Sequence, residues 1–154
     1  MCRVLVIDDE EDVRLALRRR LQRAGFTVEL ADGEREGLAM LQEARPPFDV
    51  VVTDMAMEDS QSGVRVLQHA LSQDLLAEVI VLTAYGNVSN AVDCMRRGAF
   101  DYVEKNMPGI DAYELVVLKV EDAMEQKRNA MRAIRRFEKL ARQIRDENDT
   151  DSAD

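Results

Sequence analysis

The stretch Val4-Leu5-Val6-Ile7-Asp8-Asp9-Glu10 decides the fold of this chain. Its four consecutive apolar residues are typical of a strand in a parallel sheet that helices cover on both faces. Two carboxylates follow at the point where such a strand ends. Four more short apolar runs, rich in Val and Ile, occur within the first 105 residues. The predicted strands are 4–7, 27–30, 50–53, 79–83 and 100–103.

Helix-length segments separate the predicted strands. Their apolar residues recur every three or four positions, which predicts amphipathic helices over 11–24, 33–44, 63–72 and 88–97. Asp32 is expected to cap the second of them. Crossovers of this length join parallel strands through right-handed connections. The sequence therefore predicts an α/β fold of five βα units, with a doubly wound, five-stranded parallel sheet of order 2-1-3-4-5.

Polar side chains gather at the predicted carboxyl ends of the strands. Asp8 and Asp9 follow the first strand, Asp54 follows the third, Thr83 ends the fourth and Lys105 comes just past the fifth. Ligands bind at this edge of such sheets, where the strand order reverses. Converging carboxylates repel one another, and oxygen ligands favour a hard cation such as Mg²⁺. Each residue alone also fits a structural role, as a helix cap, a strand end or a solvated charge, but together they indicate a site.

At these residues the chain resembles the receiver domain of two-component response regulators, over residues 1–122. Besides the opening stretch, the resemblance rests on Val50-Val51-Val52-Thr53-Asp54-Met55, Val81-Leu82-Thr83-Ala84-Tyr85-Gly86 and Gly98-Ala99-Phe100-Asp101-Tyr102-Val103-Glu104-Lys105. It implies a flavodoxin-like fold with the strand order given above. It also implies a phosphoacceptor in a phosphorelay, served by a sensor histidine kinase or a phosphotransfer protein.

The resemblance assigns roles to the residues at the edge. Asp54 would accept the phosphoryl group, Asp8 and Asp9 would hold Mg²⁺ together with Asp54, and Lys105 would pair with the phosphoryl oxygens. A carboxylate can act as a nucleophile toward phosphorus when the developing charge is neutralised, which the cation and the lysine would do. The implied catalytic residues are Asp54, Lys105 and Thr83, and the implied metal ligands are Asp8, Asp9 and Asp54.

The resemblance further implies that Thr83 and Tyr102 form a switch, which would alter the face made by the fourth helix, fifth strand and fifth helix. The only histidine, His69, is expected to be structural, so the donor imidazole must belong to another molecule. An independent enzyme is not expected, because the chain lacks the phosphate-binding loop, the dinucleotide-binding glycines and an Asp-x-Asp phosphatase motif at Asp54.

Two departures from the family pattern affect the site. The family usually has proline after the lysine, which permits a cis peptide, whereas Asn106 follows Lys105 here. A cis bond at that place would cost about 2.5–4 kcal/mol. The segment 57–63 lacks the usual proline and is one residue longer than common, which is expected to alter phosphate lifetime or kinase choice.

The last third of the chain predicts one long helix, because residues 111–147 contain neither Gly nor Pro. Its seam positions alternate spacings of three and four, and only Lys127 among them is not apolar. They are Tyr113, Val116, Val120, Ala123, Lys127, Ala130, Ile134, Phe137, Ala141 and Ile144. This pattern predicts a coiled coil that forms a homodimer. Residues 127–145 carry eight Lys or Arg against one Glu, a net charge of +7, so a basic helix for nucleic acid or an acidic partner is the alternative.

The sequence predicts a receiver domain over 1–123, a helical extension over 124–147 and an acidic, disordered tail over 148–154. A net charge of −9 argues against nucleic-acid binding by the chain as a whole. The two distant cysteines fit no metal or redox motif, and the N-terminus does not read as a signal peptide, so a cytoplasmic protein without membrane contact is expected. Two alternatives stay open: a receiver-like module that is never phosphorylated, and the N-terminal part of a longer DNA-binding regulator.

Overall fold

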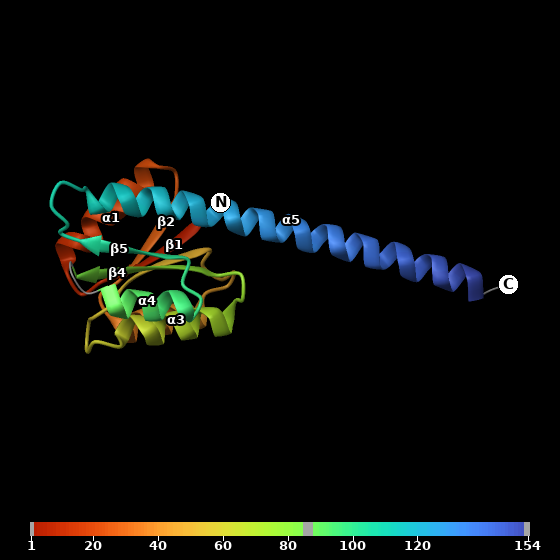
Figure 1. The fold of residues 1–154 in the computed structure, drawn as a ribbon, viewed down its shortest axis with the longest axis horizontal. Coiled ribbons are helices and arrows are strands. Elements are labelled where there is room, and N and C mark those ends of the chain that lie inside the picture. The colour runs from red at the N-terminus through yellow and green to blue at the C-terminus, as the bar shows by residue number, and fades with distance from the viewer. Residues whose placement is uncertain (1, 85–87, 153–154) are drawn as a thin grey trace.

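The computed structural model describes residues 2–84 and 88–152 of the chain. Five strands alternate with five helices in these residues, and the strands form one parallel sheet of order β2-β1-β3-β4-β5 (Figure 1). The elements are β1 Arg3–Ile7, α1 Glu11–Arg23, β2 Thr27–Ala31, α2 Glu34–Glu43, β3 Val50–Asp54, α3 Ser62–Gln73, β4 Glu78–Ala84, α4 Val88–Arg96, β5 Asp101–Lys105 and α5 Ala112–Ser152. The predicted α/β class and strand order are confirmed.

Helices cover both faces of the sheet, and alternate residues of each strand face opposite layers (Figure 1). In β1, Val4 and Val6 join a core cluster with α1 and α5, whereas Leu5 and Ile7 join a second cluster with α2, α3 and α4. All four side chains are fully buried. The strands are unbroken apolar runs because both of their faces are buried.

Several local predictions are wrong; among them, Asp54 is the last residue of β3 rather than the residue after it. Asp32 does not cap α2, because the helix begins at Glu34 with Gly33 in the capping position and no side-chain bond there. Lys105 is the last residue of β5 rather than a residue just beyond it, because β5 starts at Asp101 and pairs with β4 as far as Ala84. This pairing ties the backbone of Lys105 to the sheet and so directs its side chain.

Helix α5 is one continuous rod whose first part packs on the domain and whose remainder projects away from it (Figure 1). The Asp111 carboxylate caps its start, accepting hydrogen bonds from the backbone N–H groups of Tyr113 and Glu114 at 3.1 and 3.3 Å. Val116 and Val120 are fully buried against the sheet. The predicted long helix is therefore present, and its N-terminal half belongs to the core.

Lys127, the one polar position of the predicted seam, is 6% exposed. Its ammonium lies 3.1 Å from a carboxylate oxygen of Asp49 and 3.5 Å from one of Asp74. Contacts of the domain thus extend four residues past the predicted boundary at 123. A lysine fits this seam position because two carboxylates from the base of the sheet neutralise it there.

Beyond this contact the apolar side chains of α5 are exposed, and Phe137 is 72% exposed. The helix also continues through Ser152, into the segment for which the sequence predicts disorder. That segment contains no Gly or Pro, and the Thr150 hydroxyl bonds the carbonyl of Asp146 one turn earlier at 2.9 Å. The last two residues lie outside the described part.

The remaining sequence predictions concern single residues. Cys2 and Cys94 are both free thiols. His69 is half-buried on α3. Tyr85 and Gly86, which end one segment of the family resemblance, lie outside the described residues. None of the described helices combines the length and the apolar composition required to cross a membrane.

Candidate functional site

The carboxyl ends of β1, β3 and β5 bring two acids and one base together. Asp8 follows β1, Asp54 ends β3 and Lys105 ends β5. The ammonium of Lys105 lies 2.8 Å from a carboxylate oxygen of Asp8 and 3.1 Å from one of Asp54. All three residues come from well-packed strand ends, so their side chains are held in place before any ligand binds.

Burial shifts the pKa values of Asp8, Asp54 and Lys105. Burial, and then the charge of Asp8, raise the pKa of Asp54 to about 6. Burial likewise raises the pKa of Asp8, although the hydrogen bond from Lys105 opposes the shift. Burial alone would favour a neutral amine on Lys105, but the hydrogen bond to Asp8 and the charge of Asp54 hold its pKa above the usual range. The ammonium therefore stays charged and compensates only part of the negative charge.

Four carboxylates at this edge could hold a cation. Asp8, Asp9, Glu10 and Asp54 each offer one oxygen, and these four oxygens lie within 4.8 Å of one another. A donor set made only of carboxylate oxygens, with Asp9 and Glu10 exposed to water, suits Mg²⁺. The sequence interpretation did not include Glu10. Its place directly after Asp8 and Asp9 was the available signal, and its carboxylate also lies 3.5 Å from Lys105.

The predicted switch residues lie on neighbouring strands. Thr83 is fully buried near the end of β4. Tyr102 is half-buried on β5, pairs in register with Val81 and packs against the cluster formed with α3 and α4. Because side chains alternate along a strand, Val81 and Thr83 point to the same face. Tyr102 therefore lies beside the segment of β4 that ends at Thr83.

The residue after Lys105 is asparagine rather than proline, and the backbone there differs from the cis turn that proline would permit. Among the described residues only the Arg45–Pro46 peptide is cis, so the bond between Lys105 and Asn106 is trans. Asn106 adopts a left-handed conformation with φ of 57°. Asparagine tolerates this region better than most side chains. The turn leaves Lys105 directed at both aspartates.

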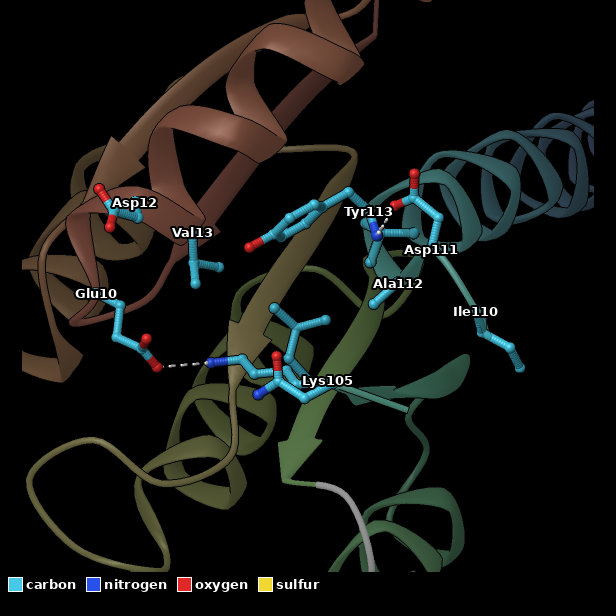
Figure 2. Close-up of a pocket in the computed structure, with 11 residues that line it drawn as sticks. Glu10, Asp12, Val13, Lys105, Ile110, Asp111, Ala112 and Tyr113 are labelled. Carbon is cyan, nitrogen blue, oxygen red and sulfur yellow. Dashed lines mark hydrogen bonds and ion pairs between the residues drawn. The ribbon is translucent and has the colours of Figure 1, made fainter. Parts of the chain in front are cut away.

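A cavity of about 260 Å³ lies beside Lys105, between the start of α1 and the start of α5 (Figure 2). Glu10 and Val13 border it on one side, and Ala112 and Tyr113 border it on the other. Its walls combine charged and apolar side chains. The edge that carries the acids is thus hollowed on the α1–α5 side, next to the lysine.

Two buried aspartates and a lysine at the carboxyl edge of a five-stranded parallel sheet are the arrangement of a receiver domain. The chain belongs to the response regulator receiver family, since the family model described as "Response regulator receiver domain" matches residues 4–117. The regulatory protein AtoC of Escherichia coli is 36% identical over 115 residues, which are 75% of this chain and 24% of AtoC.

Solved structures agree with this assignment. A response regulator receiver domain protein from Clostridium thermocellum superposes with a TM-score of 0.75 and 30% identity, covering 84% of this chain and 99% of that one. The response regulator TrrA of Thermotoga maritima, solved in complex with Mg²⁺ and BeF, superposes with a TM-score of 0.66 and 27% identity, covering 80% of this chain and 99% of TrrA.

Proposed function

We propose that the chain is the phosphoacceptor of a two-component phosphorelay, in which Asp54 receives a phosphoryl group from a histidine kinase or a phosphotransfer protein. One observation carries the proposal. The ammonium of Lys105 lies within hydrogen-bonding distance of both Asp8 and Asp54, in a group of carboxylates that together could hold Mg²⁺. TrrA, a response regulator of the same fold, was solved in complex with Mg²⁺ and BeF, which supports a role for Mg²⁺ in this chain.

The transfer requires an ionised nucleophile. A carboxylate oxygen of Asp54 attacks the phosphorus, the bond from phosphorus to the donor imidazole nitrogen breaks, and that nitrogen keeps the electron pair and takes a proton. Lys105 pairs with a phosphoryl oxygen and neutralises part of the developing charge. Asp8, Asp9 and Asp54 would hold Mg²⁺, which when bound supplies further neutralisation of the phosphoryl oxygens. Above pH 6 Asp54 is mainly ionised even without the cation.

Thr83 and Tyr102 are proposed to report the modification. An aspartyl phosphate carries about 1.5–2 negative charges and three acceptor oxygens beside the end of β4, in place of the single charge of the ionised carboxylate. A Thr83 hydroxyl that donates to one of these oxygens leaves space into which the half-buried Tyr102 ring can turn. The face formed by α4, β5 and α5 then changes. Full switching requires a difference in affinity of about 5.5 kcal/mol between the two states.

The exposed half of α5 is proposed to bind a second copy of the chain. Ile134, Phe137 and Ile144 remain exposed on one side of the rod, and an apolar seam of this kind needs a partner. In sedimentation of the full chain, Phe137→Glu is expected to halve the mass. The control Leu118→Glu, at an exposed position beside the domain, should leave the mass unchanged. A wild-type monomer that binds arbitrary duplex DNA in a salt-sensitive way would favour the nucleic-acid alternative instead.

A second candidate is the receiver segment of a longer, cytoplasmic DNA-binding regulator. The matched segment covers only 24% of the length of AtoC, a regulatory protein, and this small share supports the second candidate. The output partner would then be a further domain rather than a separate protein.

The proposal is tested with acetyl phosphate and Mg²⁺, followed by intact mass measurement at once after mixing. Wild type should gain the mass of one phosphoryl group, and Asp54→Asn should gain none. Absence of the adduct on wild type would support a receiver-like module that is never phosphorylated. An equal adduct on Asp54→Asn would place the acceptor elsewhere.

A further inference from the structure

The loop between β3 and α3 is closed on itself directly beside Asp54. The backbone N–H of Gly63 donates to the carbonyl of Met55 at 2.8 Å, which joins the two ends of the loop. A Cβ at position 63 would lie 2.8 Å from Cα of Met55 and 3.0 Å from the carbonyl oxygen of Asp54. Glycine is therefore needed for this close approach. The base of the loop is therefore fixed next to the acceptor residue.

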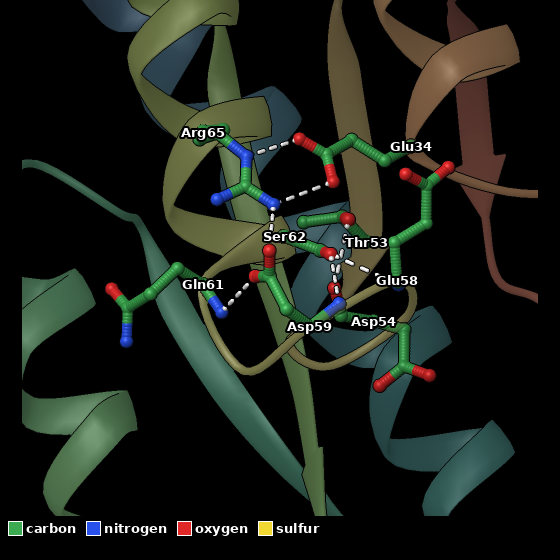
Figure 3. Close-up of polar contacts among 8 residues, drawn as sticks. All are labelled: Glu34, Thr53, Asp54, Glu58, Asp59, Gln61, Ser62 and Arg65. Atoms are coloured by element: carbon green, nitrogen blue, oxygen red, sulfur yellow. Dashed lines mark hydrogen bonds and ion pairs between the residues drawn. The ribbon is translucent and has the colours of Figure 1, made fainter.

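Asp59 and Ser62 organise the interior of the loop (Figure 3). The fully buried Ser62 hydroxyl accepts hydrogen bonds from the N–H groups of Glu58 and Asp59 at 3.1 and 3.2 Å. The Asp59 carboxylate accepts one from the N–H of Gln61 at 2.8 Å. The loop, which the sequence marks as one residue longer than common, therefore has a defined conformation.

Arg65 connects this loop to α2 (Figure 3). Two nitrogens of its guanidinium contact the two oxygens of Glu34, one of them at 2.8 Å, and the same group reaches Asp59 at 2.8 Å. Glu34 is the first residue of α2 and is 6% exposed. A bidentate pair with a buried carboxylate has a fixed geometry. Asp59, although exposed to water, is thus tied through Arg65 to a rigid part of the domain.

We propose that Arg65 is a positioning residue, which bridges Glu34 and Asp59, holds the β3–α3 loop beside Asp54 and thereby prolongs the life of the aspartyl phosphate. This inference rests on the proposed phosphoacceptor function. In the loss reaction a water oxygen attacks the phosphorus, and the bond between phosphorus and the Asp54 carboxylate oxygen breaks. The electron pair returns to the carboxylate, and inorganic phosphate leaves with the protons of the water shared between it and solvent.

The exposure of the loop explains why its position matters. Ala56 and residues 58–61 are exposed, so water lies on the outer side of the segment that starts one residue after the acceptor. A loop that is held in place restricts the approach of water to the phosphorus. Without the bridge, the loop keeps its internal hydrogen bonds and the hydrogen bond between Ser62 and Glu34, but Asp59 is no longer tied to α2, so the loop opens more often.

The test uses three full-chain variants at the bridge and one control. Arg65→Met removes both contacts, and Arg65→Lys keeps the charge without the bidentate geometry. Asp59→Asn removes the ion pair and keeps the acceptor for Gln61. The control Arg3→Met removes another arginine that pairs with a carboxylate, Glu29, at 2.8 Å and at the opposite edge of the sheet.

Two readouts are measured on each protein: hydrogen exchange of the amides of residues 57–62, and the half-life of phosphoprotein made with acetyl phosphate and Mg²⁺. Arg65→Met should exchange faster in this loop and lose phosphate about 10-fold faster, the size of effect typical of residues that orient an active group. Asp59→Asn should also exchange faster and lose phosphate faster, with an unchanged melting temperature. Arg65→Lys should give values between those of wild type and Arg65→Met. The control Arg3→Met should match wild type in both readouts.

If the loop amides of Arg65→Met exchange at the wild-type rate, the claim that Arg65 holds the loop is wrong, whether or not Asp54 is phosphorylated. Faster exchange with an unchanged half-life would overturn the effect on phosphate. A wild-type protein that takes up no phosphate would overturn the proposed function and the lifetime claim together, while exchange would still decide the bridge. If Arg65→Met does not fold, the double variant Glu34→Gln/Arg65→Met avoids the unpaired buried carboxylate and takes its place in both measurements.

Discussion

Replacing Asp54 by asparagine should stabilise the metal-free protein. The environment of Asp54 raises its pKa from 3.8 in the unfolded chain to about 6 in the folded one, through burial and then through the charge of Asp8. The folded state therefore disfavours the ionised carboxylate. Asp54→Asn keeps the shape of the side chain and removes its charge, so the unfavourable burial of that charge is lost.

The magnitude and its pH dependence follow from the two pKa values. A difference of roughly two pKa units corresponds to about 3 kcal/mol. Because the folded pKa is the higher one, the free energy of unfolding of wild type increases as the pH falls from 6 toward 3.8. Above pH 6 the Asp54 carboxyl is ionised in both states, so its contribution no longer changes with pH. The advantage of Asp54→Asn should therefore be about 3 kcal/mol at pH 8 and should vanish near pH 3.5. For a protein of this length that advantage is about 6–12 °C in melting temperature.

The assay is thermal and urea unfolding followed by far-ultraviolet circular dichroism at several pH values, with a chelator present. Adding Mg²⁺ at pH 8 should raise the stability of wild type more than that of Asp54→Asn, since a cation compensates the carboxylate that the variant lacks. An Asp54→Asn protein that is equally stable or less stable at pH 8, or whose advantage does not shrink on acidification, would refute the electrostatic reasoning.

Substitutions at three further positions test other contacts. Lys105→Met should raise the pKa of Asp54 above 6, because the compensating ammonium is gone, and a carboxyl titration by NMR without Mg²⁺ would show it. Asn106→Gly should melt close to wild type, whereas Asn106→Val should lose about 1–2 kcal/mol of stability, because a branched side chain fits a φ of 57° poorly. Equal melting temperatures for the two variants would contradict the left-handed turn. Lys127→Ala should cost about 1–3 kcal/mol in urea unfolding, because Asp49 and Asp74 lose their shared ion partner. The exposed Lys139→Ala should cost about 0.5 kcal/mol or less.

Local sequence pattern was sufficient for the sheet and for the edge where the site lies. Val4 to Ile7 form an unbroken apolar run because α1 and α5 cover one face and α2 to α4 the other. A buried parallel strand needs such a run, and parallel strands place their carboxyl ends together. Asp8 and Asp54 could therefore be assigned to one edge from their positions along the chain alone.

Pairings between distant residues required the tertiary structure, because their partners are separated by tens of residues and no spacing rule relates them. Lys127 reads as an interruption of an apolar seam until Asp49 and Asp74 are found beside it. Arg65 reads as a solvated charge until α2 brings Glu34 against it.

The same division holds at the acceptor. The sequence by itself determined which side chains reach the end of the sheet, since residue type and strand periodicity set that. Only the folded structure decided how deeply Asp54 is buried and that Lys105, at 3.1 Å, compensates part of its charge, because desolvation and distance depend on how all the surrounding elements pack.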